Sequence, residues 1–205
     1  MKRFALEGAE ICFVKLLEVI LLLYPTYFTE KVTDINVNFL NYIGIKGVVI
    51  DIDNTLVAYK VPYADSEVAR WINELKSNNI KIILLSNNTE TRVKAFAESL
   101  DLPYISMSMK PLTKNLKKAI NIISCKPQNV LVIGDQIFTD VLSANIMKIR
   151  SILVTPIEET SKNMLKIRRI LEKPIRKRLY LDSKINLNYV LKNTNFNDKR
   201  KDNDK

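Results

Sequence analysis

Acidic and basic side chains recur directly after short apolar runs of the sequence. Asp51 and Asp53 follow the run VVI and are separated by one residue, while Asp135 follows VLVIG and precedes Asp140 by five positions. Lys110 is a lone cation before a proline. Because ligands of doubly wound sheets bind beyond the carboxyl ends of the strands, we expect these side chains to meet in one pocket.

This combination of residue types indicates phosphoryl transfer. Clustered aspartates repel one another unless a cation offsets their charge, and hard oxygen ligands favour Mg²⁺. With the metal bound, one carboxylate can attack phosphorus while a neighbouring carboxylate moves the proton of the leaving group. A lysine can neutralise the charge that spreads over the phosphate oxygens. The pattern therefore predicts a Mg²⁺-dependent reaction through an aspartyl phosphate.

The composition excludes several other chemistries. The 205 residues contain no histidine, which removes Ser-His-Asp and Cys-His catalysis and almost every common catalytic zinc site. The four glycines cannot form a GxGxxG or GxxxxGK[ST] loop. Cys12 and Cys125 lie far apart, and Leu131 stands where a cysteine-dependent phosphatase needs an arginine. We expect both cysteines to be small buried residues without a disulfide.

From residue 46 onward, short β-branched runs alternate with helical stretches. Extended runs are expected at 46–53, 80–86, 103–106, 129–135 and 149–156, with helices over 64–78, 89–99, 112–123 and 137–147. This alternation predicts an α/β fold with a Rossmann-like parallel sheet wrapped by helices. The length suits one such domain with extensions at its ends.

Four segments, DIDNT, LLSNN, KP and GDQIFTD, resemble in order and spacing the four motifs of the haloacid dehalogenase-like phosphatases. The resemblance implies that Asp51 is the nucleophile, Asp53 the general acid/base and Lys110 the third-motif cation. It also implies that Asp51, Asp53 and Asp135 hold Mg²⁺, with Asp53 contributing its backbone carbonyl. Asp140 would support the metal or the lysine.

Three more residues are expected near the substrate. Ser86 resembles the second-motif phosphate ligand, and Asn87 follows it directly. Thr55 either caps the turn after the nucleophile or contacts the phosphate. The segments between the motifs have no room for the insertions that cap other members of this superfamily. The resemblance therefore implies a capless site that is open to solvent and suits a large substrate.

A closer resemblance covers roughly residues 20 to 180, carried by LYPTYF, GIKGVVIDIDNTLVAY, IKIILLSNNTETRVKAFAE and VLVIGDQIFTDVLSANIMK. These segments resemble the YqeG-type branch of subfamily IIIA, which is related to the mitochondrial phosphatidylglycerophosphate phosphatase. The resemblance implies hydrolysis of phosphatidylglycerophosphate to phosphatidylglycerol in phospholipid synthesis. Met109 departs from the pattern, because relatives often carry a second basic residue there.

The two ends of the chain differ from its centre. Residues 1–30 are expected to contain an apolar helix that docks on a membrane or on protein, residues 31–182 the phosphatase domain with a basic helix, and residues 183–205 a basic, disordered tail. Lys15 and Glu18 argue against a membrane span, and no cleaved signal peptide is expected.

The net charge of +10 is concentrated after residue 161 and attracts polyanions. Six basic residues between Arg168 and Arg178 would each add roughly 1 kcal/mol at an anionic membrane, so we expect a peripheral position on its cytoplasmic or matrix face. A phosphoprotein, a nucleotide or another ester is the alternative substrate. An RNA- or ribosome-associated protein is the alternative of another class, although Tyr180 and Tyr189 are too isolated for an aromatic RNA-binding motif.

Overall fold

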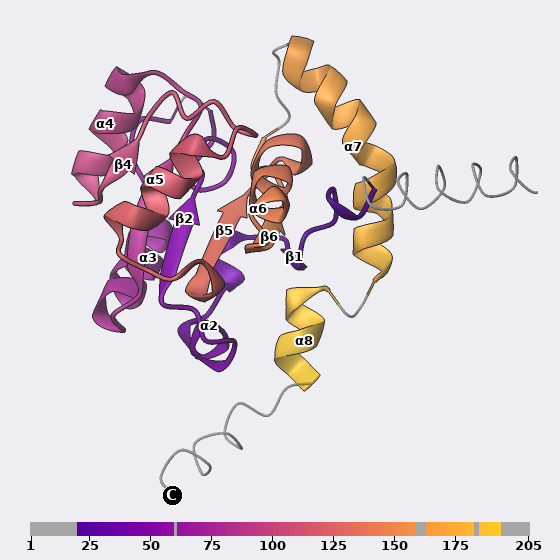
Figure 1. The fold of residues 1–205 in the computed structure, drawn as a ribbon, viewed down its shortest axis with the longest axis horizontal. Coiled ribbons are helices and arrows are strands. Elements are labelled where there is room, and N and C mark those ends of the chain that lie inside the picture. The colour runs from indigo at the N-terminus through magenta and orange to yellow at the C-terminus, as the bar shows by residue number, and fades with distance from the viewer. Residues whose placement is uncertain (1–19, 60, 159–162, 183–184, 194–205) are drawn as a thin grey trace, which may run out of the picture.

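The computed structural model describes residues 20–59, 61–158, 163–182 and 185–193 (Figure 1). Most of the apolar helix expected within residues 1–30 therefore lies outside the described residues. Within the described ranges, no helix is long and apolar enough to cross a membrane.

A six-stranded parallel sheet forms the centre of the molecule, with the strand order β1-β6-β5-β2-β3-β4. The strands are β1 (Tyr27–Thr29), β2 (Gly47–Ile50), β3 (Lys81–Leu85), β4 (Tyr104–Ile105), β5 (Val130–Gly134) and β6 (Arg150–Val154). In the register, Ile50 at the end of β2 lies between Leu84 and Ile133. The carboxyl ends of β2, β3 and β5 are therefore adjacent.

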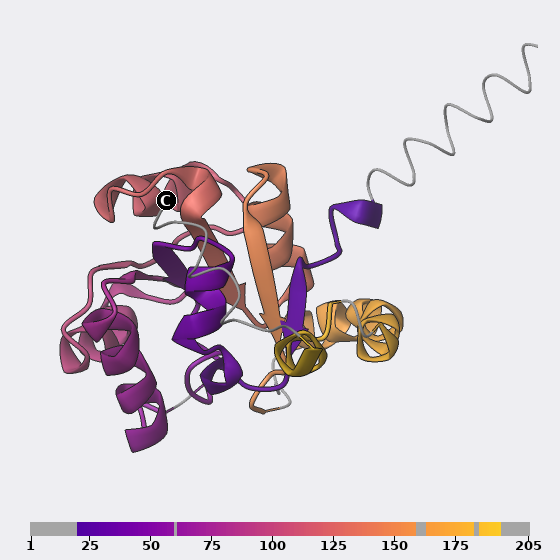
Figure 2. The ribbon, with the colours of Figure 1, turned by 90° about the horizontal axis from the view of Figure 1, so that it is seen from below.

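Helices cover both faces of this sheet (Figures 1 and 2). They are η1 (Val32–Asp34), α2 (Val37–Tyr42), α3 (Ser66–Ser77), α4 (Glu90–Ser99), α5 (Lys114–Ile122), η2 (Pro127–Asn129), η3 (Ile137–Val141), α6 (Leu142–Ile146), α7 (Asn163–Leu181) and α8 (Leu187–Asn193). Buried side chains of α2, α3, α4 and α8 pack on one face, and those of α5, α6 and α7 pack on the other.

The central strands read as unbroken apolar runs because both of their faces are covered. Val48 and Ile50 pack into the layer of α2, α3 and α4, whereas Val49 between them packs into the layer of α5. At the edge strand β1, Phe28 packs against Tyr180 of α7, with ring centroids 4.7 Å apart. This contact holds α7 at the β1 end of the sheet.

The structure confirms the expected α/β sheet, and it corrects two of the expected boundaries. Strand β1 falls within residues 1–30 but pairs with β6, Phe28 beside Leu153, so it belongs to the sheet. Helix α8 falls within the expected disordered tail, yet Leu187 is fully buried and Val190 packs against the core. The apolar spacing from Leu187 to Leu191 is that of a short helix face, which the basic composition of the tail obscured.

Candidate functional site

A buried lysine joins the ends of three elements. Lys110 Nζ lies 2.6 Å from Asp51 Oδ1, just after β2, and 2.7 Å from Asp140 Oδ1 in η3. It also donates a hydrogen bond to the carbonyl of Leu85, the last residue of β3, at 2.7 Å. Thr55 Oγ1 donates to the other oxygen of Asp51 at 3.4 Å. The predicted nucleophile is thus held by both the predicted cation and Thr55.

Asp51, Asp135 and Asp140 form a buried acidic cluster whose ligand atoms all lie within 4.8 Å of one another. Asp51 and Asp140 both pair with Lys110, and Asp135 adds a third carboxylate to the same buried space, where a divalent cation stabilises carboxylates that lie close together. These residues fit a divalent metal ion, because they bring three hard oxygen donors together in one buried space. Such an ion would supply charge neutralisation and polarise a phosphate oxygen.

The electrostatics of the cluster follow from its burial. Burial raises the pKa of Asp51 well above its usual range, and the Asp140 and Asp135 carboxylates add to the rise against the opposing effect of Lys110. Burial alone would lower the pKa of Lys110, but Asp140 and Asp51 outweigh it and raise that pKa. The lysine therefore stays charged, whereas ionising Asp51 as a nucleophile calls for a further cation.

Asp53 lies outside this acidic cluster. Its carboxylate pairs with Arg92 of α4 at 3.3 Å and accepts a hydrogen bond from Asn88 Nδ2 at 3.0 Å. The carboxylate is therefore not grouped with Asp51, Asp135 and Asp140, and a metal contact through the backbone carbonyl of Asp53 stays a prediction. Arg92 was not predicted from the sequence, because its position on α4 carries no motif.

Asn87 connects the second and third motifs. Its Oδ1 accepts hydrogen bonds from Ser108 Oγ at 2.7 Å and from the Lys110 amide at 2.8 Å. Its Nδ2 donates to the Lys110 carbonyl at 3.2 Å. Its neighbour Ser86 is buried, and Ser86 Oγ accepts from the Asn88 amide at 3.1 Å. The structure thus gives Asn87 a role in positioning Lys110, in addition to the substrate contact predicted for it.

A cavity of about 210 Å³ opens at these residues. It is lined by Asp51, Asp53, Asn54, Tyr59, Ser86, Asn87, Asn88, Gln136 and Arg168. Arg168 comes from α7, outside the four motifs, and the sequence assigned it to membrane docking. The structure places Arg168 in the lining of the cavity that also contains Asp51. The spacing of four residues between Arg168 and Glu172 indicates that both lie on one face of α7. The sequence does not show that this face is turned toward the cavity.

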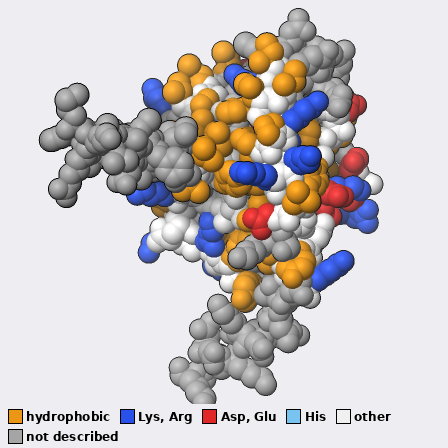
Figure 3. All heavy atoms as spheres, turned by 90° about the vertical axis from the view of Figure 1, so that its right-hand side faces the viewer, with side chains coloured by type: hydrophobic (Ala, Val, Ile, Leu, Met, Phe, Trp, Pro, Cys, Tyr) orange, Lys and Arg blue, Asp and Glu red, His pale blue; other side chains and the backbone are white. Residues whose placement is uncertain are grey.

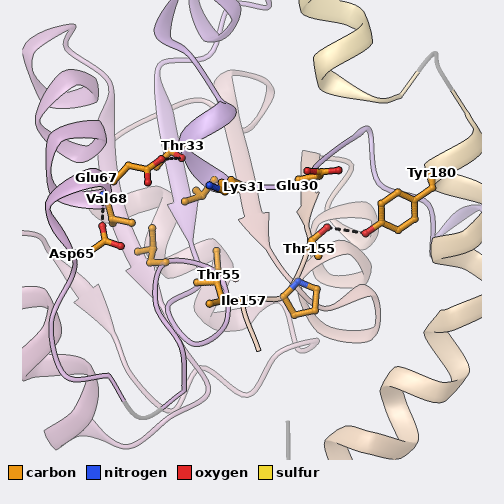
Figure 4. Close-up of a pocket in the computed structure, with 13 residues that line it drawn as sticks. Glu30, Lys31, Thr33, Thr55, Asp65, Glu67, Val68, Thr155, Ile157 and Tyr180 are labelled. Carbon is orange, nitrogen blue, oxygen red and sulfur yellow. Dashed lines mark hydrogen bonds between the residues drawn. The ribbon is translucent and has the colours of Figure 1, made fainter. Parts of the chain in front are cut away.

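A larger cavity of about 480 Å³ is lined by residues that include Thr55, Lys31 and Tyr180 (Figure 4). Three carboxylates line it, those of Glu30, Asp65 and Glu67, against the single cation Lys31. This balance disfavours an anionic phosphate ester. The predicted nucleophile Asp51 lines the smaller cavity and not this one.

The fold and this site define a haloacid dehalogenase-like phosphatase, a phosphoric monoester hydrolase. The chain belongs to the family described as mitochondrial PGP phosphatase, whose model matches residues 6–158. It is 38% identical over 133 residues to the Bacillus subtilis protein named "Probable phosphatase YqeG", covering 65% of this chain and 77% of that protein. The substrates of the present chain therefore carry a phosphate group.

Solved structures resemble parts of the chain. The cobalt-bound deoxy-D-mannose-octulosonate 8-phosphate phosphatase of Haemophilus influenzae is 13% identical, with a TM-score of 0.45 over 56% of this chain and 81% of that one. The corresponding phosphatase of Moraxella catarrhalis, in complex with magnesium, phosphate and its sugar, is 18% identical, with a TM-score of 0.39 over 49% of this chain and 64% of that one.

Proposed function

We propose that this chain hydrolyses phosphatidylglycerophosphate to phosphatidylglycerol, with Mg²⁺ as its metal and an aspartyl phosphate formed on Asp51. The observation that carries the chemistry is the 2.6 Å pairing of Lys110 with Asp51 within a buried aspartate cluster. Membership of the PGP phosphatase family supports the choice of substrate.

Each side chain has a defined task in this reaction. A carboxylate oxygen of Asp51 attacks phosphorus, the bond from phosphorus to the glycerol oxygen breaks, and Asp53 gives its proton to that oxygen. Water then attacks the phosphorus of the aspartyl phosphate and returns a proton to Asp53, which releases inorganic phosphate and restores Asp51. Lys110 offsets the negative charge that builds up on the phosphate oxygens.

The openness of the site supports a large substrate. Between β2 and β3 the described residues form one helix, α3, and between β3 and β4 they form α4. In the part of the chain that the structure describes, no inserted domain covers the cavity that contains Asp51. An open site suits a substrate whose bulk stays outside the cavity, such as a lipid held in a bilayer.

We also propose a peripheral position on the cytoplasmic or matrix face of an anionic membrane. Helix α7 exposes Ile167, Ile170 and Leu171, spaced as one helix face, together with Lys177 and Arg178. Figure 3 shows apolar side chains interspersed with basic ones on the side of the molecule where α7 lies. Each basic residue near such a surface contributes about 1 kcal/mol, and the apolar residues add burial in the interface.

Phosphate release from phosphatidylglycerophosphate in mixed micelles with Mg²⁺ tests the substrate. We expect the wild-type protein to prefer this lipid to soluble esters, and Asp51→Asn or a chelator to abolish turnover. Asp101→Asn is the matched control, because the Asp101 side chain is fully exposed away from the cluster. Wild-type protein that ignores the lipid but cleaves other esters through Asp51 would show that the substrate is wrong and the chemistry right.

Flotation with vesicles tests the membrane position. The wild-type protein should float with vesicles rich in phosphatidylglycerol, less so at high salt, and not with phosphatidylcholine alone. The triple variant Ile167→Ser, Ile170→Ser and Leu171→Ser should not float with these vesicles. Ile122→Ser with Ile146→Ser is the control, because these residues of α5 and α6 are also exposed but lie elsewhere. Equal losses in both variants would contradict a docking face on α7.

A further inference from the structure

Helix α7 turns one face toward the catalytic end of the sheet. Glu172 and Leu179 are fully buried, and Arg168 and Arg176 are half-buried. Residues 168, 172 and 176 are spaced by four and therefore lie above one another on the same helix face. Arg168 is thus one turn before Glu172, on the inner side of α7.

Glu172 and Arg176 attach this face to the loop that follows β5. Glu172 Oε1 accepts a hydrogen bond from the Ile137 amide at 2.8 Å, and Glu172 Oε2 pairs with Arg176 at 3.0 Å. The Arg176 guanidinium also donates to the carbonyls of Asp135 and Val154. These contacts attach α7 to Asp135, a member of the acidic cluster, and to the segment that follows it. The fold therefore sets the position of Arg168 at the cavity.

Arg168 differs from two other arginines near the site, Arg92 and Arg176, because no described carboxylate forms an ion pair with it. Arg92 is paired with Asp53, and Arg176 with Glu172. No carboxylate among the described residues pairs with Arg168, although its side chain lines the same cavity as Asp51. A guanidinium that is half-buried beside a substrate cavity can form charge-assisted hydrogen bonds with an anionic ligand.

We propose that Arg168 binds a second anionic group of the substrate, next to the phosphate that Asp51 attacks. The reacting phosphate already faces Lys110 and the acidic cluster, whereas Arg168 approaches from α7 on a separate element. The site then selects phosphate monoesters that carry a further phosphate. This inference rests on the proposed function, in which that second group is the phosphodiester of phosphatidylglycerophosphate.

Two soluble substrates isolate this interaction from membrane binding. One is the deacylated head group, glycerophosphoglycerol phosphate, which has a phosphodiester and a monoester; the other is glycerol 3-phosphate, which has the monoester alone. We expect Arg168→Gln to lower the ratio of their kcat/KM values by roughly 10- to 100-fold, mainly through the KM of the larger substrate. Arg168→Lys should retain part of the ratio.

Lys173→Gln is the control, because Lys173 is exposed on the same helix and its loss should leave the ratio unchanged. Equal losses on both substrates in Arg168→Gln, or no loss, would overturn the inference. If the wild-type protein does not hydrolyse the head group but cleaves other esters, the proposed substrate is contradicted and the role of Arg168 is not. Arg168 is then tested with a hexose bisphosphate against a hexose monophosphate, with the same ratio as the readout.

Discussion

At the scale of single residues, Lys110 is the cation that balances buried carboxylates. Its Nζ lies 2.6 Å from Asp51 and 2.7 Å from Asp140, and removing one partner of such a network leaves uncompensated charge in the interior. We expect Lys110→Met to lower the free energy of unfolding by about 3–5 kcal/mol in chelator. It should also lower kcat by about 100- to 1000-fold.

Urea unfolding and phosphate release measure these two effects. Lys94→Met is the control, because Lys94 pairs with the exposed Glu98 at 3.7 Å and exposed pairs contribute little. An unchanged free energy of unfolding in Lys110→Met would mean that the lysine does not stabilise the cluster.

Gly134 provides a second test at this scale, because it leaves space for Asp140. A Cβ at position 134 would overlap the carboxyl group of Asp140 and lie 2.6 Å from its Cβ. We expect Gly134→Ala to displace Asp140 from Lys110, to destabilise the fold by about 1–3 kcal/mol and to reduce kcat at least 10-fold. Gly47→Ala is matched to it, since its Cβ would lie 2.8 Å from Cys125 Sγ, away from the site. Equal activity in the two folded variants would contradict the prediction.

At the scale of elements, α7 supports the loop that carries Asp135. Glu172 holds the Ile137 amide at 2.8 Å, and Arg176 contacts the Asp135 carbonyl. Residues that hold a metal ligand in place typically change metal affinity by about 10- to 100-fold when removed. We therefore expect Glu172→Leu to weaken Mg²⁺ binding in a calorimetric titration, with Glu172→Gln less affected because its amide oxygen can still accept from Ile137. Unaltered affinity in both variants would show that α7 does not position the metal site.

The sequence predicted the elements that carry the motifs, since unbroken apolar runs followed by aspartate or serine mark the carboxyl ends of central strands. Parallel pairing of β2 with β3 and β5 then brings Asp51, Ser86 and Asp135 to the same edge of the sheet, however the helices pack. The contribution of α7 was not predictable, because a basic helix has the same composition whether Arg168 faces solvent or the cavity. The partners of Asn87 were hidden for a similar reason, since they lie more than twenty residues away along the chain.

At the scale of the whole molecule, metal binding and folding are coupled through the acidic cluster. Asp51 follows β2, whereas Asp135 and Asp140 lie in the segment after β5, and only folding brings these two segments together, so the cluster does not exist in the unfolded state. A ligand that binds only the folded state stabilises it by RT ln(1 + [L]/Kd), about 2.7 kcal/mol at one hundred times Kd. We therefore expect Mg²⁺ to raise the midpoint of thermal unfolding progressively with its concentration.

The same titration with Asp135→Asn separates the cluster from nonspecific salt effects. Asp135 is fully buried, so its replacement removes one ligand charge from the interior and should make the midpoint nearly independent of Mg²⁺. Asp101→Asn removes an exposed charge and should leave the wild-type response intact. If the wild-type midpoint does not respond to Mg²⁺ while turnover does, the ion binds only together with the substrate, because the phosphate oxygens then complete its ligand set.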